Sequence, residues 1–183
     1  LFTIRGSVER INTLIARLKQ PAASDTGSNV AVAVLPRMRA LARAHLHPVL
    51  VELSGENPGL AAIDPEHFET AVTHVLNNAV EASMPGNPVR IVVHRADGVI
   101  NVDISDRGAG MSPEFVRDEL FRPLATSKPS GTGIGAWQAR ELLTGSGATL
   151  SVHSEVGAGT TVRLTLPAFA AQSTSSLAKE QLT

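Results

Sequence analysis

The stretch SKPSGTGIGAW, residues 127–137, decides which fold the sequence encodes. Gly131, Gly133 and Gly135 let the backbone approach a bound group closely, and a helical pattern follows at once. GTGIGA matches the dinucleotide-binding fingerprint, but that fingerprint needs a strand leading into its first glycine. The preceding FRPLATSKPS carries two prolines and no alternation of apolar and polar residues. A doubly wound parallel sheet is therefore not expected, and the helix start predicts an anion site with Lys128 just upstream.

Composition excludes several classes of protein. The chain has 183 residues, of which 43% are apolar, so it can fill the core of one domain. Its 16 Lys and Arg against 17 Asp and Glu give a formal charge of -1, which does not favour binding to nucleic acid or to an anionic membrane. Cysteine is absent, which excludes disulfides and thiolate metal sites. Because the chain begins at Leu1 rather than Met, we expect it to be part of a longer protein.

The order of periodic segments predicts an α+β fold. Asp64 and Pro65 are typical of a helix start, and the helix is expected to run to Ser83. Two pairs of alternating segments predict β-hairpins. The expected elements are a helix over 34–46, a strand over 48–53, the helix from Asp64, strands over 89–95 and 99–105, a helix over 134–143, and strands over 148–155 and 160–167. We expect a two-layer sandwich in which helices cover one face of a mixed sheet.

The first 20 residues carry a heptad pattern. Apolar residues recur at spacings of three and four, at Leu1, Ile4, Val8, Ile11, Ile15 and Leu18. Such a helix either packs on the chain's own core or forms half of a helical hairpin that dimerises. Residues 20–29 are rich in Pro, Gly and small polar residues and predict a linker, whereas 168–183 predict a peripheral tail.

Two further clusters carry polar chemistry. Asn77 and Asn78 lie within a helical segment, where asparagine is unfavourable unless its amide finds a partner. That partner is either a neighbouring loop or a hard cation such as Mg²⁺. In DRGAGMS, residues 106–112, Asp106 follows a strand and could accept a hydrogen bond from an exocyclic amine such as that of adenine. Gly108 and Gly110 would let a flat ligand lie against the backbone, although the same pattern also forms ordinary turns.

Taken in order, these clusters resemble the ATP-binding domains shared by sensor histidine kinases, type II topoisomerases, Hsp90-type chaperones and MutL proteins. HVLNNAVEA resembles the N box, DRGAGM the G1 box, LFRPLATSK the F box, GTGIGA the G2 box and GAGTTVRLTLP the last strand. The resemblance covers about residues 30–167. It implies a Bergerat-type fold that binds ATP and Mg²⁺, with Asn78 as the metal ligand. The nucleotide contacts that it implies are Asn78, Ala82, Asp106, Gly108, Gly110, Met111, Lys128, Gly131, Thr132, Gly133, Ile134, Gly135 and Thr160.

Within this family, the sequence is most similar to histidine kinases of the nitrogen-regulator type. The ATPase branches have a glutamate four residues before the metal asparagine, and this chain has His74 there. Slow hydrolysis and transfer of phosphate to another group are therefore expected, with His74, Asn78 and Lys128 as the catalytic residues. A nucleotide-gated conformational module and a serine kinase of the same family remain alternatives.

The resemblance also implies an arrangement of domains and partners. Residues 1–20 would be the second helix of a dimerisation hairpin, 21–29 a linker and 30–167 the catalytic domain. No histidine lies in residues 1–20, so the phosphoacceptor is expected on an upstream helix outside this sequence. The implied partners are a second copy of the protein and a response regulator. We expect a cytoplasmic domain, and an anchor of the parent protein in the inner membrane is left open.

Overall fold

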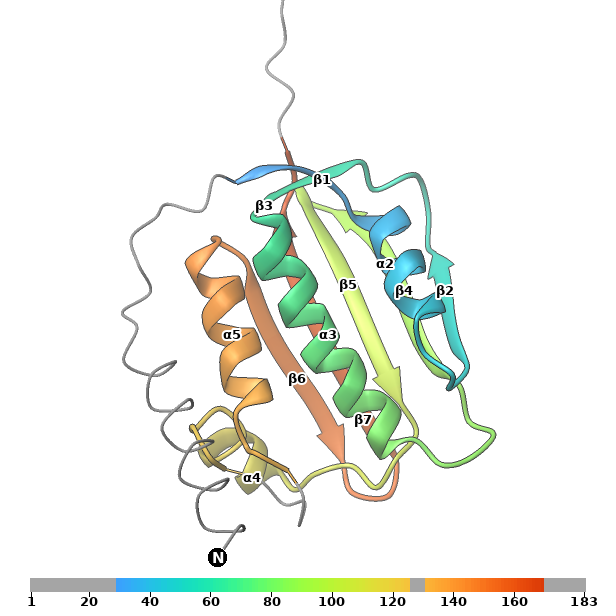
Figure 1. Cartoon of the computed structure of the whole chain (residues 1–183), viewed down its shortest axis with the longest axis vertical. Coiled ribbons are helices and arrows are strands. Elements are labelled where there is room, and N and C mark those ends of the chain that lie inside the picture. Colours follow the sequence, from blue (N-terminus) through green and yellow to red (C-terminus); the bar gives the residue numbers. More distant parts are fainter. Residues whose placement is uncertain (1–28, 126–130, 170–183) are drawn as a thin grey trace, which may run out of the picture.

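The computed structural model of the chain describes residues 29–125 and 131–169 (Figure 1). Within them, five strands form a mixed sheet in which β2 and β4 are parallel and all other neighbours are antiparallel. Strands β1 and β3 form a separate two-stranded sheet. In spatial order the large sheet consists of β2 (Val49–Leu53), β4 (Val89–Ala96), β5 (Val99–Asp106), β7 (Gly159–Pro167) and β6 (Thr149–Glu155), and the small one of β1 (Val30–Ala33) and β3 (Leu60–Ile63).

Helices cover one face of the large sheet. They are α2 (Val34–Arg43), α3 (Pro65–Ala82) and α5 (Gly135–Gly145), with the short α4 (Pro113–Asp118) near the start of α5 (Figure 1). This arrangement confirms the predicted α+β sandwich of helices on a mixed sheet. The two-stranded sheet lies at the opposite end of α3 from α4 (Figure 1).

The start of α3 follows the prediction from sequence. The Asp64 side chain accepts a hydrogen bond from the backbone N–H of His67 at 2.9 Å, and Pro65 occupies the first turn, where it has no N–H to leave unpaired. Phe68, Val72 and Val75 then recur on one side of the helix and are buried. The cap and the apolar side together place α3 along the middle of the sheet.

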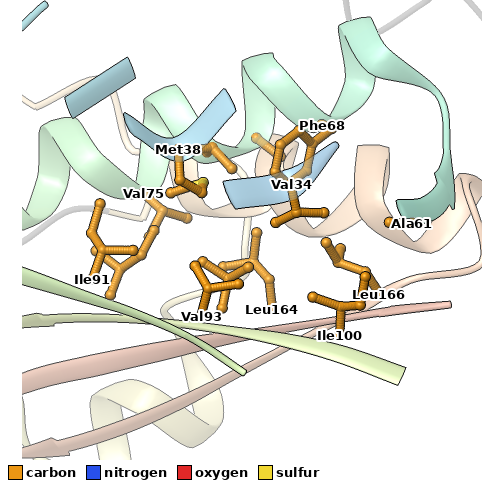
Figure 2. Packing of buried hydrophobic residues seen from close by; sticks show 14 of the residues in the cluster. Val34, Met38, Ala61, Phe68, Val75, Ile91, Val93, Ile100, Leu164 and Leu166 are labelled. Carbon is orange, nitrogen blue, oxygen red and sulfur yellow. The ribbon is translucent and has the colours of Figure 1, made fainter. Parts of the chain in front are cut away.

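The core lies between the helices and the inner face of the sheet. Val75 of α3 and Met38 of α2 lie on the side of Ile91 and Val93 of β4, whereas Phe68 of α3 lies beside Val34 of α2 (Figure 2). All are between 0% and 5% exposed. Full burial of a side chain of this size is worth about 1.5–3 kcal/mol, so this layer fixes how α3 sits on the sheet.

The outer face of the sheet is polar, as alternation requires. Arg163 of β7 donates two hydrogen bonds to the carboxylate of Asp103 on β5, at 2.6 and 2.7 Å. Thr165 donates to Asn101 at 2.9 Å on the same pair of strands. These cross-strand pairs keep the register that places the end of β5 beside the start of β7.

Several elements differ from the expectation. β1 and β3 were missed, α4 lies in the segment expected to be a loop, and α2 ends at Arg43 rather than at residue 46. Ala168, which was assigned to the peripheral tail, bridges to Ala61, and Phe169 N donates to Leu60 O at 2.7 Å. The described fold therefore continues beyond the boundary expected at residue 167. The predicted N-terminal helix of residues 1–20 lies outside the described residues.

Candidate functional site

One side of α3 carries the three positions that the family resemblance assigns to this helix. His74, Asn78 and Ala82 are spaced by four residues, so their side chains follow one another along the helix. At the end of α3, a Cβ on Gly108 would overlap the Ala82 carbonyl oxygen. One turn before Asn78, a Cβ on Gly135 would lie 3.5 Å from His74 Nδ1. Asn78 lies one turn after His74 and one turn before Ala82, and it is exposed.

The glycines of the β5–α4 loop pack against the protein's own backbone. A Cβ on Gly110, whose φ is +66°, would overlap the carbonyl oxygen of Glu155. Gly108 meets Ala82 in the same way. From the sequence, the approach of a ligand was expected to explain both glycines, but each has a structural reason of its own. They bring α3, the β5–α4 loop and the β6–β7 hairpin together at one end of the sheet.

Asp106 holds a carboxylate at this end. It closes β5 and is 9% exposed, and its Oδ1 accepts a hydrogen bond from Gly108 N at 2.8 Å. It pairs with Thr160 across the sheet, and Gly159 lies so close to its carbonyl group that a Cβ would overlap it. The turn that the sequence left open as an alternative is therefore present. A carboxylate has about four acceptor positions, so the bond to Gly108 is compatible with a further bond to an amine.

Ser154, which was not predicted from the sequence, connects two predicted site residues. Its hydroxyl accepts a hydrogen bond from Met111 N at 2.9 Å, donates to Gly159 O at 3.1 Å and shares a hydrogen bond with Thr160 Oγ1 at 2.8 Å. Met111 and Thr160 are thereby held on the same side of the hairpin. Ser154 belongs to no motif, and only the pairing of β6 with β7, in which it lies opposite Thr160, could have indicated it.

The glycine loop leads into α5 at the same end of the molecule. Gly131 and Thr132 are exposed, whereas Ile134 is only 9% exposed. Leu124 N donates to Gly133 O at 2.9 Å, and this hydrogen bond holds residues 124 and 133 next to each other. The predicted phosphate ligand Lys128 lies outside the described residues. The first turn of α5 presents backbone N–H groups that have no partner within the helix, a geometry suited to an anion.

His74 lies half-buried between α3 and α5. Burial lowers the pKa of His74 because the charged imidazolium is poorly solvated there, while a hydrogen bond with Gln138 of α5 acts in the opposite direction. The neutral ring is therefore favoured at neutral pH. The structure thus brings His74 and Asn78 of α3 to one end of the sheet, together with the remaining described site residues: Ala82, Asp106, Gly108, Gly110, Met111, Gly131, Thr132, Gly133, Ile134, Gly135 and Thr160.

Comparison with known proteins agrees with this geometry. The sequence profile of the family described as Histidine kinase-, DNA gyrase B-, and HSP90-like ATPase matches residues 63–170. The matched range covers α3, the β5–α4 loop, the glycine loop and β7. The chain belongs to this family, and it binds ATP as a member of it.

Curated relatives place it among the kinases. The chain is 28% identical to sporulation kinase D of Bacillus subtilis over 90% of its own length and 34% of that protein. It is 32% identical to the histidine protein kinase DivJ of Caulobacter vibrioides, over 60% of the chain and 19% of that protein. It carries the ATP-binding catalytic domain of a sensor histidine kinase. The chain spans about a third or less of the length of these two relatives.

Solved structures share the fold. The mycobacterial sensor histidine kinase MprB matches with a TM-score of 0.61 and 25% identity, over 72% of this chain and 89% of that one. The catalytic domain of the histidine kinase ThkA matches with a TM-score of 0.65 and 17% identity, over 75% and 94%. In the described part of the chain, no helix is both long and apolar enough to span a membrane.

Proposed function

We propose that this domain binds Mg-ATP and transfers its γ-phosphoryl group to a histidine on a helix that lies outside the sequence. The observation that carries the proposal is the meeting of three distant segments at one end of the sheet. These are the Asn78 side of α3, the Asp106 carboxylate and the start of α5. An amide oxygen, a carboxylate and a helix N-terminus are the groups needed for a cation, a purine amine and a phosphate.

Each segment has a distinct role in this proposal. Asp106 accepts a hydrogen bond from the adenine amine, and Met111 and Thr160 line the same side. The exposed amide of Asn78 offers an oxygen ligand to Mg²⁺, which would reduce the charge of the phosphates. The N–H groups at the start of α5 and the ammonium of Lys128 hold the phosphates, so that an incoming imidazole can attack in line.

His74 explains why transfer is preferred to hydrolysis. Activation of water needs a positioned general base. The carboxylate that serves this role in the ATPase branches is replaced by the half-buried His74, which forms a hydrogen bond with Gln138 and packs beside Gly135. We therefore propose slow hydrolysis, so that bound ATP persists until the acceptor arrives.

The roles of the longer protein belong to the same proposal. We propose that residues 1–20 form part of a dimerisation hairpin, and that the phosphohistidine passes its phosphoryl group to a response regulator. The domain would act on the cytoplasmic side, whatever anchors the parent protein. The heptad pattern of residues 1–20 and the kinase relatives support this arrangement.

Replacement of Asn78 tests the metal role. Asn78→Ala should weaken binding of a non-hydrolysable ATP analogue at least tenfold in the presence of Mg²⁺, measured by isothermal titration calorimetry. Asn77→Ala is the matched control, because Asn77 is the exposed neighbour in the same helix and points about 100° away. Equal effects of the two substitutions, or no effect of either, would contradict the proposed metal site.

Two further measurements test the base site and the reaction. Asp106→Asn keeps an oxygen for Gly108 N but adds a donor facing the adenine amine, so discrimination of ATP against GTP should fall about tenfold or more. Labelled ATP mixed with the domain and the upstream helix should give acid-labile label on that helix. Steady ATP hydrolysis without an acceptor, and no label on the helix, would favour a nucleotide-gated module instead.

A further inference from the structure

A hollow with an arginine-rich lining lies beside the nucleotide end and is distinct from the site described above. Its volume is about 230 Å³, and it opens at the surface between α4 and α5. The residues that line it are Arg117, Asp118, Phe121, Arg122 and Arg140. None of them is among the nucleotide contacts that the resemblance implies, although Phe121 and Arg122 lie in the F box. Glu114 and Glu119, the other acidic residues of this segment, do not line it.

The charges of the hollow are only partly neutralised. Three arginines face one aspartate, a net formal charge of two positive. Arg117 forms a two-point ion pair with Asp118, through Nε at 3.0 Å and through an NH2 group at 2.8 Å. Within residues 29–125 and 131–169, neither Arg122 nor Arg140 forms an ion pair. Asp118 also interacts electrostatically with Arg122, so this one carboxylate of the lining is shared by Arg117 and Arg122.

Phe121 orients one of the guanidinium groups of this lining. The Arg140 guanidinium carbon lies 4.9 Å from the centroid of the Phe121 ring, which is the geometry of a cation–π contact. A guanidinium held over an aromatic ring loses less freedom when it binds, and its edge still carries donors for both oxygens of a carboxylate. The ring also supplies an apolar wall that suits the methylene groups of an acidic side chain.

The charge distribution of the chain indicates where the anion comes from. The chain as a whole has a formal charge of -1, so the arginines form a local feature. Residues 1–28, the longest part outside the described structure, contain four Lys and Arg against two Asp and Glu. That segment is itself positively charged and does not complement the hollow. Residues 1–28 are therefore a poor match by charge, and an acidic surface is the complement of this lining.

We propose that this hollow docks an acidic surface of a separate protein partner, whose carboxylates pair with Arg122 and Arg140. Arg122 is two residues from Leu124, whose N–H is bonded to Gly133 O in the glycine loop. A partner held here therefore lies at the end of the molecule where the phosphates of ATP are expected. The docking surface does not require that ATP be bound, so the two proposals can fail separately.

A labelled hexaglutamate peptide is the probe. The 183-residue chain should bind it at low ionic strength, as measured by fluorescence anisotropy, and binding should weaken as salt rises. The double variant Arg122→Ala/Arg140→Ala should bind it about fivefold to tenfold more weakly, the value for two exposed charge pairs. Arg122→Ala alone, which leaves the Phe121 contact intact, should give about half of this loss on a logarithmic scale.

The control removes the same charge elsewhere. Arg39→Ala/Arg43→Ala changes two exposed arginines of α2, which lies near the opposite edge of the sheet from α4, and should alter peptide affinity less than about twofold (Figure 1). Equal loss in both double variants would show only a general charge effect and would overturn the proposal. So would complete displacement of the peptide by an equal concentration of inorganic phosphate, which would indicate a phosphate site. Asn78→Ala should retain peptide binding, which separates this test from that of the nucleotide site.

Discussion

The two ends of the α3–α5 pair are held in different ways. At the nucleotide end, backbone packs on backbone, with Gly108 against Ala82 and Gly110 against Glu155. At the opposite end, side chains make the connections. His67 Nδ1 lies 3.0 Å from Ser146 Oγ, Asn29 Nδ2 donates to Ser146 O at 3.1 Å, and Asp64 caps α3.

The nucleotide end therefore keeps groups exposed for binding, whereas the opposite end mainly holds the helices in place. Where glycines make the contacts, α3 and the β5–α4 loop approach each other through their backbones, and Asn78 stays exposed, although Asp106 and Ser154 also form side-chain hydrogen bonds at this end. Where side chains make the contacts, their polar atoms already form hydrogen bonds within the protein. Ser146 is 3% exposed and uses both its hydroxyl and its carbonyl group in this way.

The largest expected effect is at Gly108. In Gly108→Ala the new methyl group overlaps the Ala82 carbonyl oxygen, so α3 and the β5–α4 loop must separate. Contacts that cannot relax cost about 3 kcal/mol or more, and the shift also moves Asn78 away from Asp106. We expect the free energy of unfolding in urea to fall by that amount and ATP affinity to fall at least tenfold.

Gly145→Ala is the control for that substitution. Gly145 ends α5 at the opposite end, and a Cβ there meets nothing within 4 Å. Since alanine is the better helix former, stability should be unchanged or rise by up to about 1 kcal/mol, with no change in ATP affinity. If Gly108→Ala left ATP binding intact, the glycine contacts would not be what assembles the site.

Substitutions at the end of α3 opposite the nucleotide site should change stability but not ATP affinity. Ser146→Ala removes the hydroxyl that pairs with His67 Nδ1 and leaves a partly buried nitrogen without that partner. The expected loss is about 1 kcal/mol of unfolding free energy, without a change in ATP affinity. Ser151→Ala, at an exposed position of β6, is the control and should be neutral. A loss of nucleotide binding in Ser146→Ala would contradict the separation of the two ends.

The sequence predicted the locally encoded parts of the fold. The start of α3 is confirmed because Asp64 and Pro65 act within one turn. The two hairpins were predicted because alternation repeats over the full length of each strand. β1 and β3 were missed because VAVA and LAAI are short and show no polar alternation, so that only their pairing with each other defines them.

Short motifs indicated the candidate site residues, but they did not indicate how the chain positions them. Four short motifs in order were enough to name Asn78 and Asp106. The partners of Gly108 and Gly110 could not be read in the same way, because Ala82 and Glu155 come from distant parts of the chain. Ser154 was missed for the same reason, since its contacts depend on the register of β6 and β7.

The smallest expected effect is at His74, which lies at the nucleotide end but is held by a side-chain contact. Burial lowers its pKa in the folded protein, so the unfolded chain binds the proton more readily. The stability due to neutral His74 is therefore fully present above the unfolded pKa of about 6.5 and is lost as pH falls through the lowered folded value. Because the ring is half-exposed, this loss should be below about 1 kcal/mol.

The variant His74→Gln separates the contribution of His74 titration to stability from other effects of pH, because glutamine does not titrate and can still form a hydrogen bond with Gln138. The carboxylates that govern most acid destabilisation are common to both proteins and cancel in the comparison. Between pH 7.5 and pH 5, the unfolding free energy of the native chain should fall more than that of His74→Gln, measured by urea denaturation. Equal losses would mean that the His74 ring is as well solvated in the folded protein as in the unfolded chain.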